Sequence, residues 1–159
     1  HRRGRTGNGS CSSWKYAMES LRLEKSYRMW GMDLTKEYSI LEAGLDRFVK
    51  IQKGQFTGRE ALLLQRESGV PQEFITLEVD VDDADPMGNE PVFSGNEMIG
   101  RATSGCYGHS VGKSLALAYV ESGTGSVGTE LELEILDKRY PARVIEESPC
   151  DPQNEKLRV

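Results

Sequence analysis

Arg22, in the charged stretch RLEK, has the most specific chemistry of any residue in this chain. A guanidinium group is planar and can donate two parallel hydrogen bonds to one carboxylate, so it can bind the acidic tail of a small molecule. The competing interpretation is an ion pair with a nearby acid, Glu19 or Glu42, that only fixes a helix. Spacing alone does not separate the two roles.

Three aromatic residues could contact a flat ring in a ligand. Tyr27 and Trp30 follow Arg22 near the helical repeat, and that spacing is more typical of a packed core face than of a binding site. Tyr107 stands in the predicted turn TSGCYGHS. There it either approaches a ligand with its ring or covers the end of a barrel.

The segment GHSVGKS, over 108–114, resembles a phosphate-binding loop only in part. Such a loop needs four residues between its glycines and a helix after its lysine. Here three residues separate the glycines, and the residues from Ser114 onward have the pattern of a strand. We therefore predict a turn between two strands and no nucleotide site.

An acidic run before Gly88 suggests a calcium loop and consists of Asp80, Asp82, Asp83 and Asp85. A calcium loop of the EF-hand type requires glycine at its sixth position and glutamate at its twelfth. Counting from Asp80, these positions hold Asp85 and Pro91. We predict a solvated connection between strands.

Composition narrows the classes of function. The net charge of −5 argues against nucleic acid as the main partner, because phosphate recognition requires a concentrated basic surface. No apolar run approaches the roughly twenty residues of a membrane span. The 3 cysteines lack CxxC or CxxH spacing and the 2 histidines lack an obvious third ligand. We expect no metal, and free thiols in a reducing compartment.

A helix with one packed face is predicted to end at Gly31, because apolar residues recur near helical spacing at Leu21, Leu23, Tyr27 and Trp30. Residues 1–13 have almost no apolar side chains, and we expect a disordered or non-native head there.

A second helix is predicted over 58–68, with Gly69 at its end. Thr57 and Glu60 have the spacing of a capping box, in which Thr57 would be the N-cap. A short strand is predicted over 48–51.

From Gln72 onward the pattern changes to strands. FITLEVDV and TELELEIL alternate apolar and polar residues, which is typical of strands with one face in a core and one in water. Strands are predicted over 73–81, 91–93, 98–103, 115–120, 130–136 and 140–146. About six short antiparallel strands with Gly-rich turns indicate a small barrel, so the fold class is α+β and mostly β.

Several separate segments resemble one family. RLEKSYRMWG, LEAGL, GREAL, IGRATSG, SLALAYV and SPCDPQNEKL are similar in order and spacing to segments of the glycine cleavage T-protein (aminomethyltransferase) family. The resemblance is closer still to the C-terminal halves of dimethylglycine and sarcosine dehydrogenases. It covers residues 16–159, and agreement among separate motifs is more specific than any single short pattern.

The resemblance implies a fold and a ligand. Residues 14–70 would be the remnant α/β end of a folate-binding domain, and residues 71–159 a C-terminal β-barrel domain. Tetrahydrofolate would be the ligand, with FAD in an upstream domain. Arg22 would contact the glutamyl tail of the folate, and Trp30 and Tyr107 are our further candidates for folate contacts.

The resemblance also implies where the chemistry lies. The family's reactive aspartate and the glutamate that holds the pteridine ring belong to the preceding part of the folate-binding domain, and neither has a match here. Where many relatives have an aromatic residue after LEAGL, this chain has Arg47, which removes a stacking contact. We therefore expect this chain alone to be inactive.

The resulting expectation is the C-terminal, folate-binding portion of a flavin- and tetrahydrofolate-dependent demethylating dehydrogenase acting on an N-methylated glycine. The alternatives are part of a flavin-free aminomethyltransferase and a non-catalytic binding or regulatory module of the same fold. Expected partners are folate and the upstream domains, and a homo-oligomer is compatible with the sequence. The expected location is the cytoplasm, or the mitochondrial matrix in a eukaryote. The substrate amine stays open.

Overall fold

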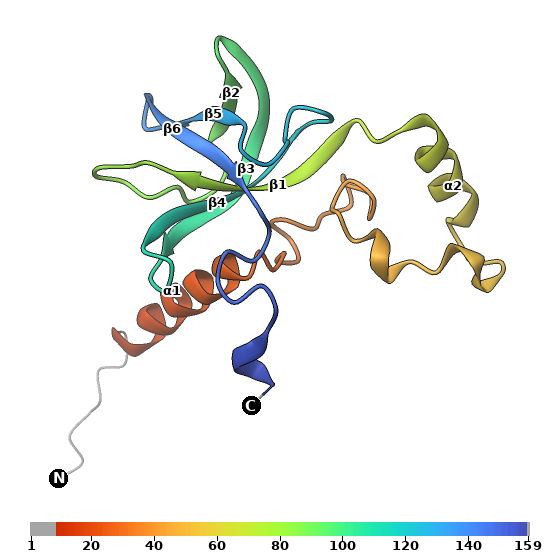
Figure 1. The fold of residues 1–159 in the computed structure, drawn as a ribbon, viewed down its shortest axis with the longest axis horizontal. Coiled ribbons are helices and arrows are strands. Elements are labelled where there is room, and N and C mark those ends of the chain that lie inside the picture. Colours follow the sequence, from red (N-terminus) through yellow and green to blue (C-terminus); the bar gives the residue numbers. More distant parts are fainter. Residues whose placement is uncertain (1–8, 159) are drawn as a thin grey trace.

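The computed structural model describes residues 9–158, and its elements run along the chain as Figure 1 shows. The helices are α1 (Gly9–Glu24) and α2 (Arg59–Ser68), with short 3-10 helices at Asp46–Phe48, Ile51–Lys53 and Glu155–Leu157. The strands are β1 (Gln72–Val79), β2 (Pro91–Ser94), β3 (Glu97–Gly108), β4 (Lys113–Glu121), β5 (Glu130–Ile135) and β6 (Lys138–Ile145).

The six strands close into one antiparallel barrel in the order β1-β4-β3-β2-β5-β6. The barrel closes at β1, which pairs with β4 on one side and β6 on the other. Closure leaves no open sheet edge to pair with another chain. The predicted fold class, α+β and mostly β with a barrel of six antiparallel strands, is confirmed.

Strand β4 is buried on both faces, which explains its nearly continuous apolar sequence SLALAYV. Its inward side chains Ala116, Ala118 and Val120 belong to the barrel core. Its outward side chains, among them Leu117 and Tyr119, form a second core with residues that precede the barrel. This second core joins the first part of the chain to the barrel.

Helix α1 contacts β3 and β4 through its C-terminal half. Ser20, Leu23 and Glu24 are buried there, whereas residues 14–18 are exposed. The helix begins at Gly9 and so extends into the expected head, whose disordered or non-native character stays a prediction. A formed helix extends cheaply, because each added residue gains a hydrogen bond without a new nucleus. Residues 1–8 of the expected head lie outside the described residues.

Helix α1 ends at Glu24 and not at Gly31 as predicted. Ser26 has a left-handed φ of 51° and is fully buried. Its hydroxyl lies 2.9 Å from that of Thr76 on β1 and accepts a hydrogen bond from the Ser148 amide at 3.0 Å. These contacts turn the chain onto the barrel and override the helical periodicity of the residues that follow.

The segment between α1 and the barrel corrects two predictions. The strand predicted over 48–51 is wrong, because two 3-10 helices begin or end in this region and the barrel sheet does not include it. Thr57 is not the N-cap of α2. Gly58 holds that position in a left-handed conformation without a side-chain cap. The end of α2 before Gly69 agrees with the prediction.

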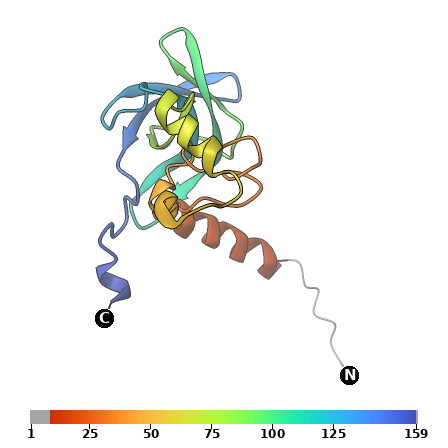
Figure 2. The same cartoon turned by 90° about the vertical axis from the view of Figure 1, so that its right-hand side faces the viewer.

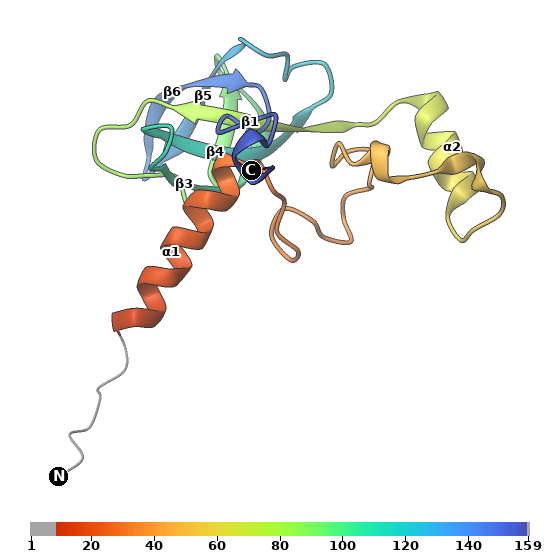
Figure 3. The same ribbon diagram turned by 60° about the horizontal axis from the view of Figure 1, so that its bottom comes forward.

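Helix α2 stands away from the barrel (Figures 1 and 3) and has no buried residue. In the view of Figure 2 it lies in front of the barrel. An isolated helix of this length is marginal in water. Within residues 9–158, no helix has both the length and the apolar character needed to cross a bilayer.

Candidate functional site

Asp33 lies where the residues after α1 meet the barrel, and it is fully buried. Its Oδ1 accepts hydrogen bonds from the hydroxyls of Thr103 at 2.5 Å and Ser104 at 2.7 Å. Its Oδ2 accepts from Arg22 Nη1 at 2.7 Å and from the Met29 amide at 2.8 Å. These donors compensate a charge that would otherwise be costly to bury.

Two adjacent side chains of β3 reach this one carboxylate because the strand is irregular. In a regular strand, Thr103 and Ser104 would point to opposite faces. The pairing of β3 with β4 shifts between Ala102 and Ser104, and such a bulge inserts one extra residue and redirects its side chain. The bulge therefore directs two donor hydroxyls of the barrel to one carboxylate oxygen of Asp33.

Arg22 is held by acids on two sides, and its side chain is only 9% exposed. Its Nε and Nη2 donate to Glu19 Oε2 at 3.0 and 2.5 Å. Its Nη1 donates to Asp33 and to the carbonyl of Tyr27 at 2.9 Å. Of the two acids expected from spacing, Glu19 is a partner, whereas Glu42 accepts from a backbone amide three residues earlier. The role of Arg22 toward a ligand stays a prediction.

A groove of about 890 Å³ runs along the outer face of α1. One wall of the groove comes from α1 and the residues after it, and the other wall comes from the C-terminal segment. The residues that line the groove include Trp14, Met18, Leu21, Arg22, Tyr27, Cys150 and Lys156. Lys25 joins the walls, because its Nζ donates to the carbonyls of Cys150 and Asp151 at 3.2 and 2.6 Å. Figure 3 shows the C-terminal segment beside the end of α1. Aromatic faces next to cations suit a flat ring with a carboxylate tail.

Tyr27 and Trp30 lie outside the core, contrary to the expectation from their spacing. Their side chains are 54% and 74% exposed, because α1 has already ended and the chain no longer follows a helical repeat. Tyr27 lines the groove. Trp30 lies beyond it, in an isolated bridge with Leu34.

Tyr107 lies at the end of the barrel and lines a separate hollow of about 460 Å³ with the acidic connection over 80–85. The preceding residue, Cys106, packs in the second core beneath α1. Because side chains alternate along a strand, Tyr107 points away from that core. The structure therefore does not bring Tyr107 and Arg22 into one cavity.

The acidic connection fastens the barrel end. Asp85 accepts a hydrogen bond from the Ser114 hydroxyl, and Asp83 accepts one from Tyr140 at 2.5 Å. Within the part of the chain that the structure describes, no group of three or more His, Cys, Asp or Glu side chains could hold a metal ion.

The segment GHSVGKS forms the turn between β3 and β4, with Lys113 as the first residue of β4. This is the arrangement predicted from its sequence. Lys113 Nζ donates to Glu78 at 2.7 Å, and this hydrogen bond raises the pKa of Lys113.

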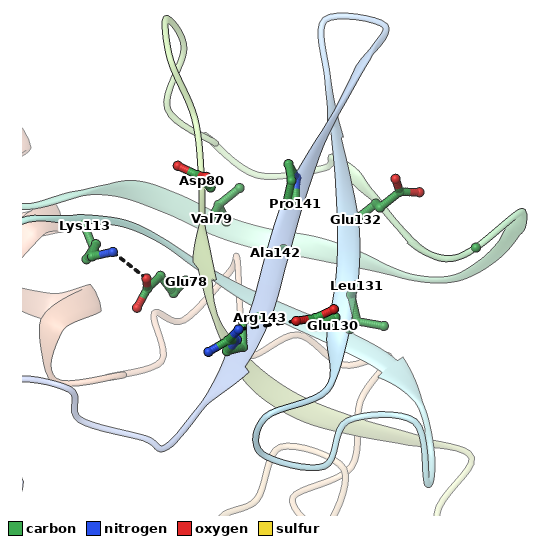
Figure 4. Close-up of a pocket in the computed structure, with 11 residues that line it drawn as sticks. Glu78, Val79, Asp80, Lys113, Glu130, Leu131, Glu132, Pro141, Ala142 and Arg143 are labelled. Atoms are coloured by element: carbon green, nitrogen blue, oxygen red, sulfur yellow. Dashed lines mark hydrogen bonds and ion pairs between the residues drawn. The ribbon is translucent and has the colours of Figure 1, made fainter.

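The same ion pair borders a hollow of about 560 Å³ on the flank of the barrel (Figure 4). Arg143 and Glu130 pair across its other side at 3.3 Å. Such exposed pairs contribute little to stability. Because these charges satisfy one another across neighbouring strands, we assign no ligand to this hollow.

Cys106 and Cys150 are free thiols. Burial, with a smaller effect of the Glu19 charge, raises the pKa of Cys106 from 9.0 to about 11. Only the thiolate is nucleophilic. In a variant with Cys11→Ser and Cys150→Ser, Cys106 should therefore react with a disulfide reagent at pH 8 about a hundredfold more slowly in the folded protein than in urea.

The raised pKa of Cys106 fixes how its reaction rate and the stability of the protein change with pH. The reaction rate of folded Cys106 should rise with pH until about 11. Because the folded thiol holds its proton more tightly than the unfolded one, the free energy of unfolding should fall between pH 9 and about 11. A rate that stops rising at pH 9 would contradict the elevated pKa.

Two family models match the chain in order. Residues 11–53 match the GCVT N-terminal domain, and residues 72–151 match the glycine cleavage T-protein C-terminal barrel domain. The second match contains all six strands of the barrel. This chain belongs to the glycine cleavage T-protein family. The resemblance inferred from the motifs is thereby confirmed.

Individual members of the T-protein family are longer than this chain. The mitochondrial dimethylglycine dehydrogenase of Rattus norvegicus is 44% identical over 133 residues, which are 83% of this chain and 16% of that protein. The aminomethyltransferase of Moorella thermoacetica is 42% identical over 129 residues, 81% of this chain and 35% of that protein. The chain thus spans well under half of each.

A solved member of the family has the same fold. The crystal structure of the glycine cleavage system aminomethyltransferase T from Bartonella henselae superimposes with a TM-score of 0.79 at 26% identity. The match covers 86% of this chain and 38% of that one.

Sequence reasoning missed the centre of the buried network. Asp33, Thr103 and Ser104 were not candidates, although Asp33 binds Arg22 and the two hydroxyls hold Asp33 in place. The only local signal is a single aspartate between the apolar residues Met32 and Leu34. Such a residue is rarely fully buried unless it is paired.

Proposed function

We propose that this chain is the C-terminal portion of a tetrahydrofolate-dependent enzyme that removes a methyl group from an N-methylated glycine. Residues 14–70 would end its folate-binding domain, and residues 71–159 would form its C-terminal barrel domain. The observation that carries this proposal is the 44% identity to the rat dimethylglycine dehydrogenase over 83% of the chain.

Uncovered apolar surfaces support a larger domain around residues 14–70. Trp14, Met18 and Leu21 on α1 are between 50% and 78% exposed, and α2 has no buried residue. Clustered apolar side chains of this kind mark contact surfaces. The partners that we propose for them are the upstream domains of the same polypeptide.

The groove beside α1 suits tetrahydrofolate, which combines flat rings with a carboxylate-bearing tail. In this proposal Arg22 binds a glutamyl carboxylate of that tail. Trp30 has a largely exposed ring available for a folate ring. Tyr107 would reach the folate only across the end of the barrel, since it lines a different hollow.

When bound, FAD in an upstream domain would supply oxidation of the N-methyl amine by hydride removal, and tetrahydrofolate would supply capture of the one-carbon unit. The residues of this chain would bind the folate tail and form part of the pocket wall. The free thiols Cys106 and Cys150 fit a reducing compartment, either the cytoplasm or the mitochondrial matrix.

A second candidate is a flavin-free aminomethyltransferase, favoured by the 42% identity to the Moorella thermoacetica protein. A third is a non-catalytic module of the same fold. The full reading frame separates them. A flavin-binding domain upstream supports the first, a folate-binding domain with its aspartate and glutamate but no flavin domain supports the second, and loss of both acids supports the third.

In the full-length protein, Arg22→Ala should weaken the binding of tetrahydrofolate by roughly ten- to a hundredfold. A lost charge-assisted hydrogen bond to a carboxylate costs about 1.5 to 3 kcal/mol when it is partly desolvated. Isothermal titration calorimetry measures the affinity. Arg66→Ala, on the exposed face of α2, is the matched control and should leave the affinity unchanged.

A pterin without the glutamyl tail distinguishes the contact from a general loss of structure. It should bind the wild type and Arg22→Ala about equally. If Arg22→Ala lowers only the thermal stability and leaves the tetrahydrofolate affinity unchanged, Arg22 is a helix-fixing residue and this part of the proposal fails.

The isolated chain should show no turnover of dimethylglycine or sarcosine with tetrahydrofolate. The reactive aspartate and the pteridine-holding glutamate that the family resemblance implies have no match in it. An assay of formaldehyde release and of methylene transfer, run beside a protein-free control, tests this. Turnover above the control would overturn the view that the chemistry lies upstream.

A further inference from the structure

The two acids that bind Arg22 lie in different environments. Asp33 has a side chain that is 0% exposed, and its oxygens also accept from Thr103, Ser104 and a backbone amide. Glu19 is 15% exposed, and within the described residues it accepts hydrogen bonds from Arg22 alone. Asp33 is therefore fixed by the fold, whereas Glu19 is held by a single partner.

The guanidinium of Arg22 accordingly has one group of donors with fixed partners and one edge whose partner can be replaced. Nη1 is occupied by Asp33 and by the Tyr27 carbonyl. Nε and Nη2 both donate to one oxygen of Glu19. This side edge can instead bind both oxygens of a carboxylate through two parallel hydrogen bonds, which is the stronger arrangement. Glu19 therefore occupies this edge without using its full capacity.

Charge decides whether a further carboxylate can bind beside Glu19. The cluster of Arg22, Glu19 and Asp33 has one positive and two negative side chains. A folate carboxylate added to it would place three negative charges around one guanidinium in a poorly solvated site, where like charges repel strongly. Glu19 occupies the Nε and Nη2 edge of Arg22, so an acidic ligand can use this edge only when Glu19 leaves.

We infer that Glu19 is an exchangeable counter-ion of Arg22, which competes with the ligand carboxylate, while Asp33 is a positioning residue that keeps the guanidinium in place. This inference rests on the proposed folate contact of Arg22. The exchange leaves no guanidinium edge unpaired, because the ligand carboxylate takes the place of Glu19, and Glu19, at 15% exposed, lies near enough to the surface to regain water. Competition by Glu19 thus lowers the observed affinity of the protein for the acidic tail of the ligand.

The test compares glutamate variants in the full-length protein with 5-formyltetrahydrofolate and with a pterin that lacks the glutamyl tail. Glu19→Gln removes the competing charge and should raise the affinity for the folate about three- to tenfold, with no change for the pterin. Glu19→Asp keeps the charge on a shorter side chain and should give a smaller gain. Glu67→Gln, an exposed glutamate on α2, is the matched control.

The outcomes separate this inference from the proposed function. If Arg22→Ala weakens folate binding but Glu19→Gln and Glu19→Asp leave it unchanged or weaken it, Glu19 is a permanent partner and the inference is overturned. If Arg22→Ala has no effect on folate binding, the proposed contact fails first. An equal gain for the pterin in Glu19→Gln would also overturn the inference, because the effect would not depend on a ligand carboxylate.

Discussion

Replacing Asp33 with alanine should lower the free energy of unfolding by about 3 to 5 kcal/mol, because it leaves Arg22 without its buried counter-ion. It also leaves the hydroxyls of Thr103 and Ser104 and the amide of Met29 without their acceptor. A polar group that loses its partner in the interior retains the full cost of desolvation. Urea denaturation followed by circular dichroism measures the change.

Asp82→Ala is the matched control, since the side chain of Asp82 is 87% exposed and, among residues 9–158, pairs with Lys138 alone, at 3.7 Å. We expect a change of about 0.5 kcal/mol or less for it. Asp33→Asn retains one acceptor oxygen and should be destabilised less than Asp33→Ala, which keeps the comparison informative if the alanine variant does not fold. Equal stability of Asp33→Ala and Asp82→Ala would show that the buried network does not stabilise the fold.

Leu23→Ala should destabilise the protein by about 2 to 5 kcal/mol, the usual cost of truncating a buried leucine. Leu23 is fully buried and belongs to the second core with Leu115, Leu117 and Tyr119. It is the apolar side chain by which α1 is held against the barrel. Thermal and urea unfolding measure the loss.

Leu21→Ala provides the comparison on the same helix, and helix propensity cancels because the substitution is identical. Leu21 is 63% exposed, so the isolated chain should change by about 0.5 kcal/mol or less. If Leu21→Ala costs as much as Leu23→Ala, something covers the outer face of α1 in solution. The dependence of the unfolding midpoint on protein concentration would then show whether a second copy does so.

The barrel could be predicted because the apolar and polar residues of its strands follow a recognisable pattern. β5 alternates buried Leu131, Leu133 and Ile135 with more exposed glutamates, and β4 is apolar throughout because both of its faces are covered. Such local patterns depend on each residue and its nearest neighbours in the chain. The family could also be predicted from the sequence, because several short motifs occur in the order typical of the family, and recognising them requires no knowledge of the structure.

Where the polar side chains meet could not be predicted in the same way. Arg22 is an evident candidate from its chemistry, but its partner Asp33 lies 11 positions further on, and Asp33 in turn binds Thr103, 70 positions away. The bulge that directs Thr103 toward Asp33 has no clear local signature. Contacts of such separation depend on how the barrel closes.

The end of α1 shows the same division between sequence and structure. That a helix precedes the barrel follows from the sequence alone, because apolar and charged residues recur near the helical repeat. The end of this helix at Glu24 and the exposure of Tyr27 and Trp30 to solvent follow from contacts between distant parts of the chain. The helix stops there because buried hydrogen bonds of Ser26 to β1 and to the C-terminal segment are worth more than the weak helical preference of the residues that follow.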